Sequence, residues 1–301
     1  MSEAVGKGRA MLLLGMVILL WGVNWPIMKV GLQSITPLWF AVARVFLGAV
    51  SLFVLLAATG QVRMPPRADL PIVLSVGVLQ IGMFLGLTHT ALLFVDAGRS
   101  AILAYTTPLW VVPIAAVVLH ERVGLARLAA LGLGMGGLAV LFNPLAVDYH
   151  NHLELFGNGM LLLGALVWAI TIVHVRVHRW QASALALMPW QMLIGGALLL
   201  PLAFAVDGRP DVKLSPEFVA ILAYNGPVAS AFCYWAFVTV NRSFGAATTS
   251  LGSLGVPVVG VLAATLMLGE PLTAAKLTGL ALISGGVAVL SLGHRNGAAS
   301  C

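Results

Sequence analysis

Long apolar runs, each long enough to cross a lipid bilayer as a helix, follow one another along almost the whole chain. In lipid, only helices and closed barrels satisfy every backbone hydrogen-bonding group. These runs are continuous and lack the alternation of a transmembrane β-strand, so we expect an all-α membrane protein. We predict ten transmembrane helices, with these bounds: 10–31, 36–58, 71–94, 98–120, 124–143, 157–177, 183–206, 216–240, 246–268 and 273–293.

The composition also indicates a membrane location. Hydrophobic residues make up 60% of the 301 residues and charged residues only 9%, whereas a soluble domain carries about 25% charged residues. The basic residues are scattered singly, which argues against nucleic-acid binding. The two cysteines, Cys233 and Cys301, do not predict a disulfide framework or a zinc site. The sequence has no phosphate-binding loop or catalytic triad, so we expect no cofactor, no metal and no enzyme activity.

The basic residues between the runs predict the orientation of the chain. When the N-terminus is placed in the cytoplasm, most of them fall on the inner side, as the positive-inside rule requires. The inner segments hold Lys7, Arg9, Arg63, Arg67, Arg122, Arg127, Arg176, Arg179, Arg242 and Arg295, and the outer segments hold Arg99, Arg209, Lys213 and Lys276. We therefore expect both termini to be cytoplasmic.

The chain contains an internal repeat, because residues 97–141 match residues 246–290 without a gap. Shared apolar composition explains many leucine and valine matches, but not a proline, a glutamate and a glycine pair in register. These recur as Pro108 with Pro257, Glu121 with Glu270, and Gly136-Gly137 with Gly285-Gly286. We predict a first repeat at 1–145, an outer connecting loop at 146–156, a second repeat at 157–295 and a flexible tail at 296–301.

Each predicted repeat holds five spans, so the second enters the membrane from the opposite side. Inverted repeats related by a pseudo-two-fold axis in the membrane plane are typical of alternating-access transporters, which bind substrate near the midplane. A non-transporting scaffold has no need of two symmetric access states. Because one chain already supplies a pseudo-dimer, we expect a monomer.

Several motifs give the chain a resemblance to a known family. They are WGVNW at 21–25, TPLWFAVARVFLGA at 36–49, THTALLFVDAGRSAILAYTTPLWVVPIAAVVLHERV at 88–123, and the segment at 245–290 that begins GAATTSLGSLG. The chain resembles the EamA type of the drug/metabolite transporter superfamily, including bacterial exporters of amino acids, among them aromatic ones. The resemblance implies a ten-helix carrier in the bacterial inner membrane that exports small metabolites.

Polar and aromatic residues inside the first span are candidates for the substrate site. Trp21 and Asn24 share one helical face by their i, i+3 spacing. An amide in hydrocarbon needs hydrogen-bond partners, so Asn24 either binds substrate or makes a contact between helices. The second repeat departs from the first here, because Thr171 ends an Ala-Ile-Thr segment where Asn24 ends Gly-Val-Asn. A site built on this pair is asymmetric.

Arg44 and His89 are ionisable groups within predicted spans. An arginine inside the membrane is a functional-site hypothesis by default. Arg44 either holds a substrate carboxylate or bonds polar groups inside the bundle. His89 either lines the cavity, where its ordinary pKa suits a proton-linked step, or is a buried core histidine.

Aromatic side chains and prolines complete the candidate set. Tyr105, Trp110 and Trp168 fall inside spans, where aromatic rings suit apolar or aromatic substrate groups; the alternative is an interfacial aromatic belt. The expected hinge or gating positions are the prolines that remove a backbone donor from a span: Pro26, Pro108 and Pro257.

These features favour an inner-membrane exporter of small zwitterionic metabolites, most simply aromatic or neutral amino acids. No Asp or Glu lies at the centre of a span, which disfavours cationic drugs and polyamines as substrates. The alternatives are an exporter of hydrophobic drugs or purine-like metabolites, a non-transporting scaffold and an intramembrane enzyme.

Overall fold

The computed structural model describes residues 6–120, 124–142, 150–244 and 246–298, and within them the fold is helical apart from turns, irregular connecting segments and one isolated β-bridge, Ile35 with Val212. Eight helical stretches are long and apolar enough to span a membrane, and a shorter apolar helix covers Leu125–Val140. The eight are Lys7–Gly31, Pro37–Ala58, Arg67–Ala91, Ala97–Val118, His152–Val177, Ala184–Val206, Pro216–Ser243 and Thr248–Leu268. The expected all-α membrane class is confirmed.

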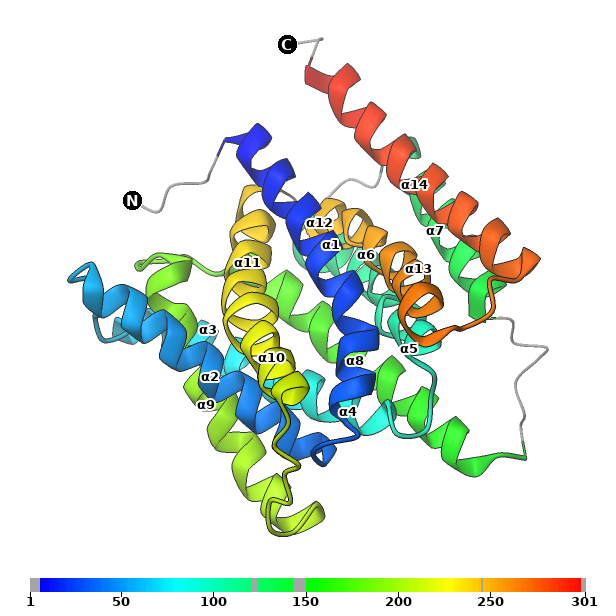
Figure 1. The fold of residues 1–301 in the computed structure, drawn as a ribbon. Helices are drawn as coiled ribbons and strands as arrows, with labels where there is room; N and C mark the ends of the chain where they lie inside the picture. The colour runs from blue at the N-terminus through cyan, green and yellow to red at the C-terminus, as the bar shows by residue number, and fades with distance from the viewer. Residues whose placement is uncertain (1–5, 121–123, 143–149, 245, 299–301) are drawn as a thin grey trace.

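Several of the stretches are divided into shorter elements (Figure 1). In chain order the elements are α1 (Lys7–Gly31), α2 (Pro37–Ala58), η1 (Arg67–Asp69), α3 (Leu70–Ser75), η2 (Val76–Met83), α4 (Phe84–Ala91), α5 (Ala97–Ala104), α6 (Thr107–Val118), α7 (Leu125–Phe142), α8 (His152–Val177), α9 (Ala184–Val206), α10 (Pro216–Ala223), η4 (Tyr224–Phe232), α11 (Cys233–Ser243), α12 (Ala246–Gly252), α13 (Gly255–Leu268) and α14 (Ala274–Ala298). Three parts of the prediction lie outside the described residues: Glu121, residues 146–149 of the connecting loop and residues 299–301 of the tail.

The interruptions have local causes and recur in both halves of the chain. The π-helical segment η2 divides α3 from α4, and η4 divides α10 from α11. The turn at Tyr105 and Thr106 separates α5 from α6, and the turn at Ser253 and Leu254 separates α12 from α13. Hydroxyl groups donate to backbone carbonyls at both turns: Thr106 Oγ1 donates to Leu103 O at 2.8 Å, and Ser253 Oγ donates to Ser250 O at 2.7 Å.

The packing partners of the first half and the second half correspond to one another. Helix α1 packs against α11 and α13, and α8 packs in the same way against α4 and α6. Helix α2 contacts η4, and α9 contacts η2. Two further pairs, α2 with α9 and α7 with α14, join equivalent helices directly (Figure 1). Exchanging the two halves therefore leaves this list of neighbours unchanged.

Glycines from the repeated pair hold α7 against α14. A Cβ atom at Gly137 would lie 2.7 Å from Gly279 O, and one at Gly286 would lie 2.9 Å from Ala130 O. Neither position can carry a side chain without moving the partner backbone. Small residues allow this kind of close approach between membrane helices.

The helices α2 and α9 are joined at one end by the residues that follow α9. Asp207 accepts a hydrogen bond from the Leu38 backbone N–H at 2.8 Å, and Trp39 Nε1 donates to Gly208 O at 3.0 Å. The Trp39 ring stands edge-on to Phe204, with ring centroids 4.8 Å apart. We call this set the Trp39 clasp.

The opposite end of the same helix pair carries equivalent contacts, the Trp190 clasp. Trp190 Nε1 donates to Arg63 O at 2.9 Å, and its ring stands edge-on to Phe53 at 5.1 Å. Nearby, the buried carboxylate of Asp69 accepts the backbone N–H of Ala182 at 2.7 Å. The two clasps link the halves of the chain at both ends of the α2–α9 pair.

Candidate functional site

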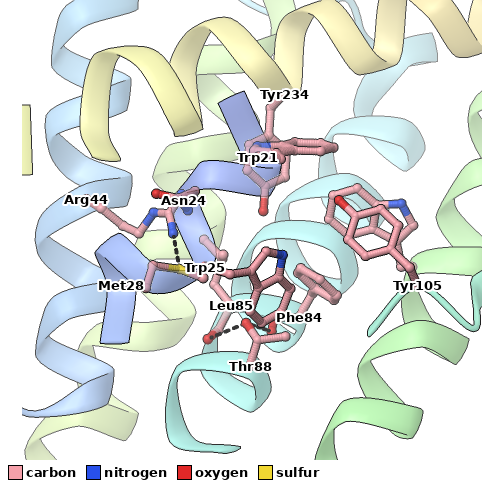
Figure 2. A pocket seen from close by; sticks show the side chains of 11 residues that line it. Trp21, Asn24, Trp25, Met28, Arg44, Phe84, Leu85, Thr88, Tyr105 and Tyr234 are labelled. Carbon is pink, nitrogen blue, oxygen red and sulfur yellow. Dashed lines mark hydrogen bonds between the residues drawn. The ribbon is translucent and has the colours of Figure 1, made fainter. Parts of the chain in front are cut away.

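A pocket lies at the middle of α1, between elements of both halves (Figure 2). The first half supplies α1, α2, α4 and the turn between α5 and α6, and the second half supplies α8 and α11. The lining residues are Trp21, Asn24, Trp25, Met28, Arg44, Phe84, Leu85, Thr88, Tyr105, Trp168 and Tyr234.

Aromatic rings form one side of the pocket. Trp21 packs edge-on against Trp168 and Tyr234, with ring centroids 5.4 Å apart in both pairs. Phe84 packs against Trp168 at 4.4 Å, and Phe237 lies behind, 5.3 Å from Trp21. Edge-to-face pairs stabilise the packing of the rings beyond the contribution of their buried area, and so hold the rings in defined orientations. The cluster presents a rigid apolar surface to the cavity.

The other side of the pocket is polar, and its central group is Arg44. Its side chain is 1% exposed. Arg44 Nε donates to Ser230 Oγ at 2.9 Å, and its Nη1 lies 3.0 Å from Met28 Sδ (Figure 2). Among the described residues, no carboxylate forms an ion pair with this guanidinium. The buried Oδ1 of Asn24 in the same pocket also has no hydrogen-bond donor within the described chain.

The π-helical segment η4 anchors both sides of the pocket. Ser230 of η4 accepts the bond from Arg44, and the carbonyl of the preceding Ala229 accepts a bond from Trp21 Nε1 at 2.8 Å. Segments of π-helix occur frequently at functional sites. A movement of η4 would therefore shift a guanidinium partner and an indole partner together.

The free space in the pocket is small. Its cavity measures about 30 Å³, enough for a water molecule. Sites for small organic ligands usually enclose roughly 300–1,000 Å³. A ligand of that size would fit only if the surrounding helices separated.

The structure brings together five of the eight residues predicted to bind substrate, namely Trp21, Asn24, Arg44, Tyr105 and Trp168. The other three do not line the pocket. His89 is fully buried against Phe40, and its Nδ1 donates to Leu85 O at 2.8 Å. The Thr171 hydroxyl donates to Trp168 O within its own helix, at 2.7 Å. Trp110 is 37% exposed on α6.

Two other lining residues, Phe84 and Thr88 on α4, were not predicted. They reach the pocket because of how α4 is rotated in the bundle, which a single sequence does not reveal. The partner of Arg44, Ser230, is an ordinary serine within a weakly polar segment.

The predicted hinge prolines occupy two kinds of setting. Pro26 lies inside α1, which continues without a break to Gly31. Pro108 lies in the first turn of α6, just after the interruption at Tyr105 and Thr106. Pro257 takes the matching place near the start of α13.

Comparisons with known proteins agree with this architecture. The model of the EamA-like transporter family matches twice, at residues 8–143 and 155–292. An uncharacterized transporter of Bacillus subtilis, YoaV, is 28% identical over 90% of this chain and 92% of its own length. A probable amino-acid metabolite efflux pump of Salmonella typhimurium is 26% identical over 93% of this chain and 94% of its own.

A solved crystal structure shares the fold, with a TM-score of 0.76 over 97% of this chain and 99% of the other, at 22% sequence identity. The family resemblance of the sequence motifs is confirmed, because the matched segments cover nearly the whole chain. A multi-pass protein that moves a small molecule across a bacterial membrane agrees with the apolar helices described above. The chain belongs to the EamA-like transporter family.

Proposed function

We propose that this transporter exports small zwitterionic metabolites, namely amino acids with aromatic or neutral side chains. One observation carries the proposal: a fully buried Arg44 guanidinium, with neutral partners, faces a pocket whose opposite side is aromatic. A charge held inside a membrane is costly. A substrate carboxylate would lower that cost by forming a bidentate ion pair with the guanidinium.

The remaining groups of an amino acid find complementary partners in the pocket. The unpaired Oδ1 of Asn24 is a hydrogen-bond acceptor for the substrate ammonium group. The apolar or aromatic side chain would lie against Trp21, Trp168 and Tyr234. Relatives named as a probable amino-acid metabolite efflux pump and a probable terminal-alkyne amino-acid exporter support the same class.

We propose further that the chain forms ten transmembrane helices in two inverted repeats, at 1–145 and 157–295. The two family matches and the interchangeable packing partners support this arrangement. The two repeats would open the pocket to each side in turn. The α2–α9 pair, held at both ends by the two clasps, would stay closed during this movement.

The setting of the protein follows from the same reasoning. The distribution of basic residues supports an inner-membrane location with both termini in the cytoplasm. We propose a monomer, because one chain contains both repeats and the pocket between them.

Counterflow in proteoliposomes tests the function. Vesicles holding the purified protein are loaded with an unlabelled amino acid, and uptake of labelled tryptophan, phenylalanine, threonine or methionine is followed. We expect unlabelled aromatic or neutral amino acids to drive uptake, and amines that lack the carboxylate to fail. Uptake driven equally by the amines would contradict the assigned role of Arg44. Protein-free vesicles are the control.

Export of flat heteroaromatic metabolites, such as purines, is the second candidate, because the aromatic side of the pocket would stack on them equally well. Hydrophobic drugs fall in the same group. Counterflow driven by a nucleobase and not by any amino acid would select this candidate.

A further inference from the structure

A second cavity lies between α2, η4 and the start of α11, and is distinct from the central pocket. It measures about 230 Å³. Its walls are Ser51, Leu52, Leu55, Leu185, Pro227, Ala231, Phe232 and Trp235. We call it the α2–α11 cavity.

The chemistry of the walls selects an apolar occupant. Ser51 is the single wall residue with a polar aliphatic side chain, and its hydroxyl already donates to Leu47 O at 2.7 Å. No charged residue lines the cavity. Apolar cavities of roughly 150 Å³ stay dry and take up molecules of the size of benzene. A larger cavity of this kind needs hydrocarbon to fill it.

The position of the cavity identifies the source of that hydrocarbon. Its walls belong to apolar stretches that are long enough to span the membrane. Leu55, at the rim, is 50% exposed, and Trp235 is half-buried. Leu185 lies in the first turn of α9, so one end of the cavity is near the membrane surface. A phospholipid in the adjoining leaflet can insert a chain there without leaving the bilayer.

The cavity also adjoins the contact that holds Arg44. Ser51 lies two helical turns beyond Arg44 on the same face of α2. Between them, Gly48 packs against η4, where an added Cβ would lie 3.2 Å from Ser230 Cβ. Pro227 and Ala231 of η4 form the far wall. A molecule bound inside the cavity would therefore contact η4, the segment that carries Ser230.

We propose that the α2–α11 cavity binds one acyl chain of a membrane phospholipid, wedged between α2 and η4. The bound chain supports the π-helical segment whose Ala229 and Ser230 hold Trp21 and Arg44. The site takes its ligand from the bilayer and is separate from the substrate route. The proposal requires only that the protein lies in a membrane.

Native mass spectrometry of the protein, purified from membranes and stripped with mild detergent, tests the site. We expect wild-type protein to retain one phospholipid. The substitution Ala231→Phe fills the cavity and should abolish this retention, whereas Leu202→Phe, at an exposed position of α9 outside the cavity, should not. The rim substitution Leu55→Phe gives a second filling variant at a half-exposed position that tolerates change.

Reconstitution then identifies the part of the lipid that binds. Protein freed of the retained lipid by a harsher detergent wash is mixed with dioleoyl phosphatidylglycerol or with glycerol 3-phosphate, which lacks acyl chains. We expect the phospholipid, and not glycerol 3-phosphate, to restore the retained mass. Phospholipid with brominated chains should quench the fluorescence of Trp235, so the quenching should be weaker in Trp235→Phe than in wild type. Wild-type protein without retained lipid, or equal retention in folded Leu55→Phe and wild type, would overturn the proposal. Neither result depends on which metabolite is transported.

Discussion

The guanidinium of Arg44 lies within the membrane-spanning part of α2, held by a hydroxyl and a thioether. An arginine offers five donors in a planar fork, so these two contacts leave donors for a substrate. On α9, Gly195 packs against Gly77 O as Gly48 of α2 packs against Gly226 O, so the residue that corresponds to Arg44 is the uncharged, buried Gln191. The proposed substrate site is therefore asymmetric, although the surrounding packing is shared by both halves.

Arg44→Lys separates charge from geometry. The lysine keeps the positive charge but loses the planar fork that matches a carboxylate. A lost charge-assisted hydrogen bond costs about 1.5–3 kcal/mol, so we expect counterflow to fall by roughly tenfold or more. The measurement is initial uptake of labelled phenylalanine in proteoliposomes. Arg99→Lys, which changes a cation paired with Glu154 outside the pocket, is the matched control and should keep wild-type uptake.

At the scale of single residues, the sequence predicts which side chains share a face of one helix. It does not predict which neighbouring helix that face meets. Trp21 and Asn24 line the same pocket because residues three apart share a helical face. His89 was an equally reasonable candidate, but the rotation of its helix turns the ring toward Phe40. The rotation of a helix is set by its neighbours, and these are not readable from a single sequence.

The bounds of the elements follow closely from hydropathy. The run predicted at 36–58 is α2, Pro37–Ala58, and the run predicted at 183–206 is α9, Ala184–Val206. Prolines and polar residues at the ends of runs determine these limits. The π-helical segments were not predicted, because an extra residue in a turn changes neither the length nor the apolar character of a run.

The contact between α7 and α14 allows a test with adjacent glycines. A Cβ at Gly137 would meet the backbone of α14, whereas one at Gly136 has nothing within 4 Å. We expect Gly137→Ala to destabilise the protein by about 1–3 kcal/mol, as overpacking does, and Gly136→Ala to leave stability unchanged or slightly higher. The measurement is the thermal unfolding midpoint in detergent. Equal midpoints for the two variants would contradict the close contact.

Two helix pairs, α2–α9 and α7–α14, join the two halves of the whole molecule. The central pocket is lined by elements of both halves. If the clasped α2–α9 pair stays closed during transport, separation must occur elsewhere. The Gly98 backbone N–H, at the start of α5, donates to the Glu270 carboxylate beyond α13 at 3.5 Å, and so joins the two halves away from the clasps.

Cross-linking distinguishes the parts that stay closed from the parts that open. In a background with Cys233→Ser and Cys301→Ser, we expect a short bifunctional reagent that joins Leu38→Cys to Asp207→Cys to leave counterflow near the wild-type rate. The same reagent joining Gly98→Cys to Glu270→Cys should stop it. Each variant without reagent is the control. Loss of uptake in the first cross-linked protein would show that the α2–α9 pair opens.

The buried cation of α2 has an electrical consequence. The proposed zwitterionic substrate would add no net charge, so the carrier would hold the positive charge of Arg44 whether it is empty or loaded. Each elementary charge that crosses the field of a membrane at 100 mV changes the energy by about 2.3 kcal/mol. Any displacement of α2 along the membrane normal therefore couples the access equilibrium to voltage, and the energised membrane of a living cell would favour whichever state brings Arg44 closer to the cytoplasm.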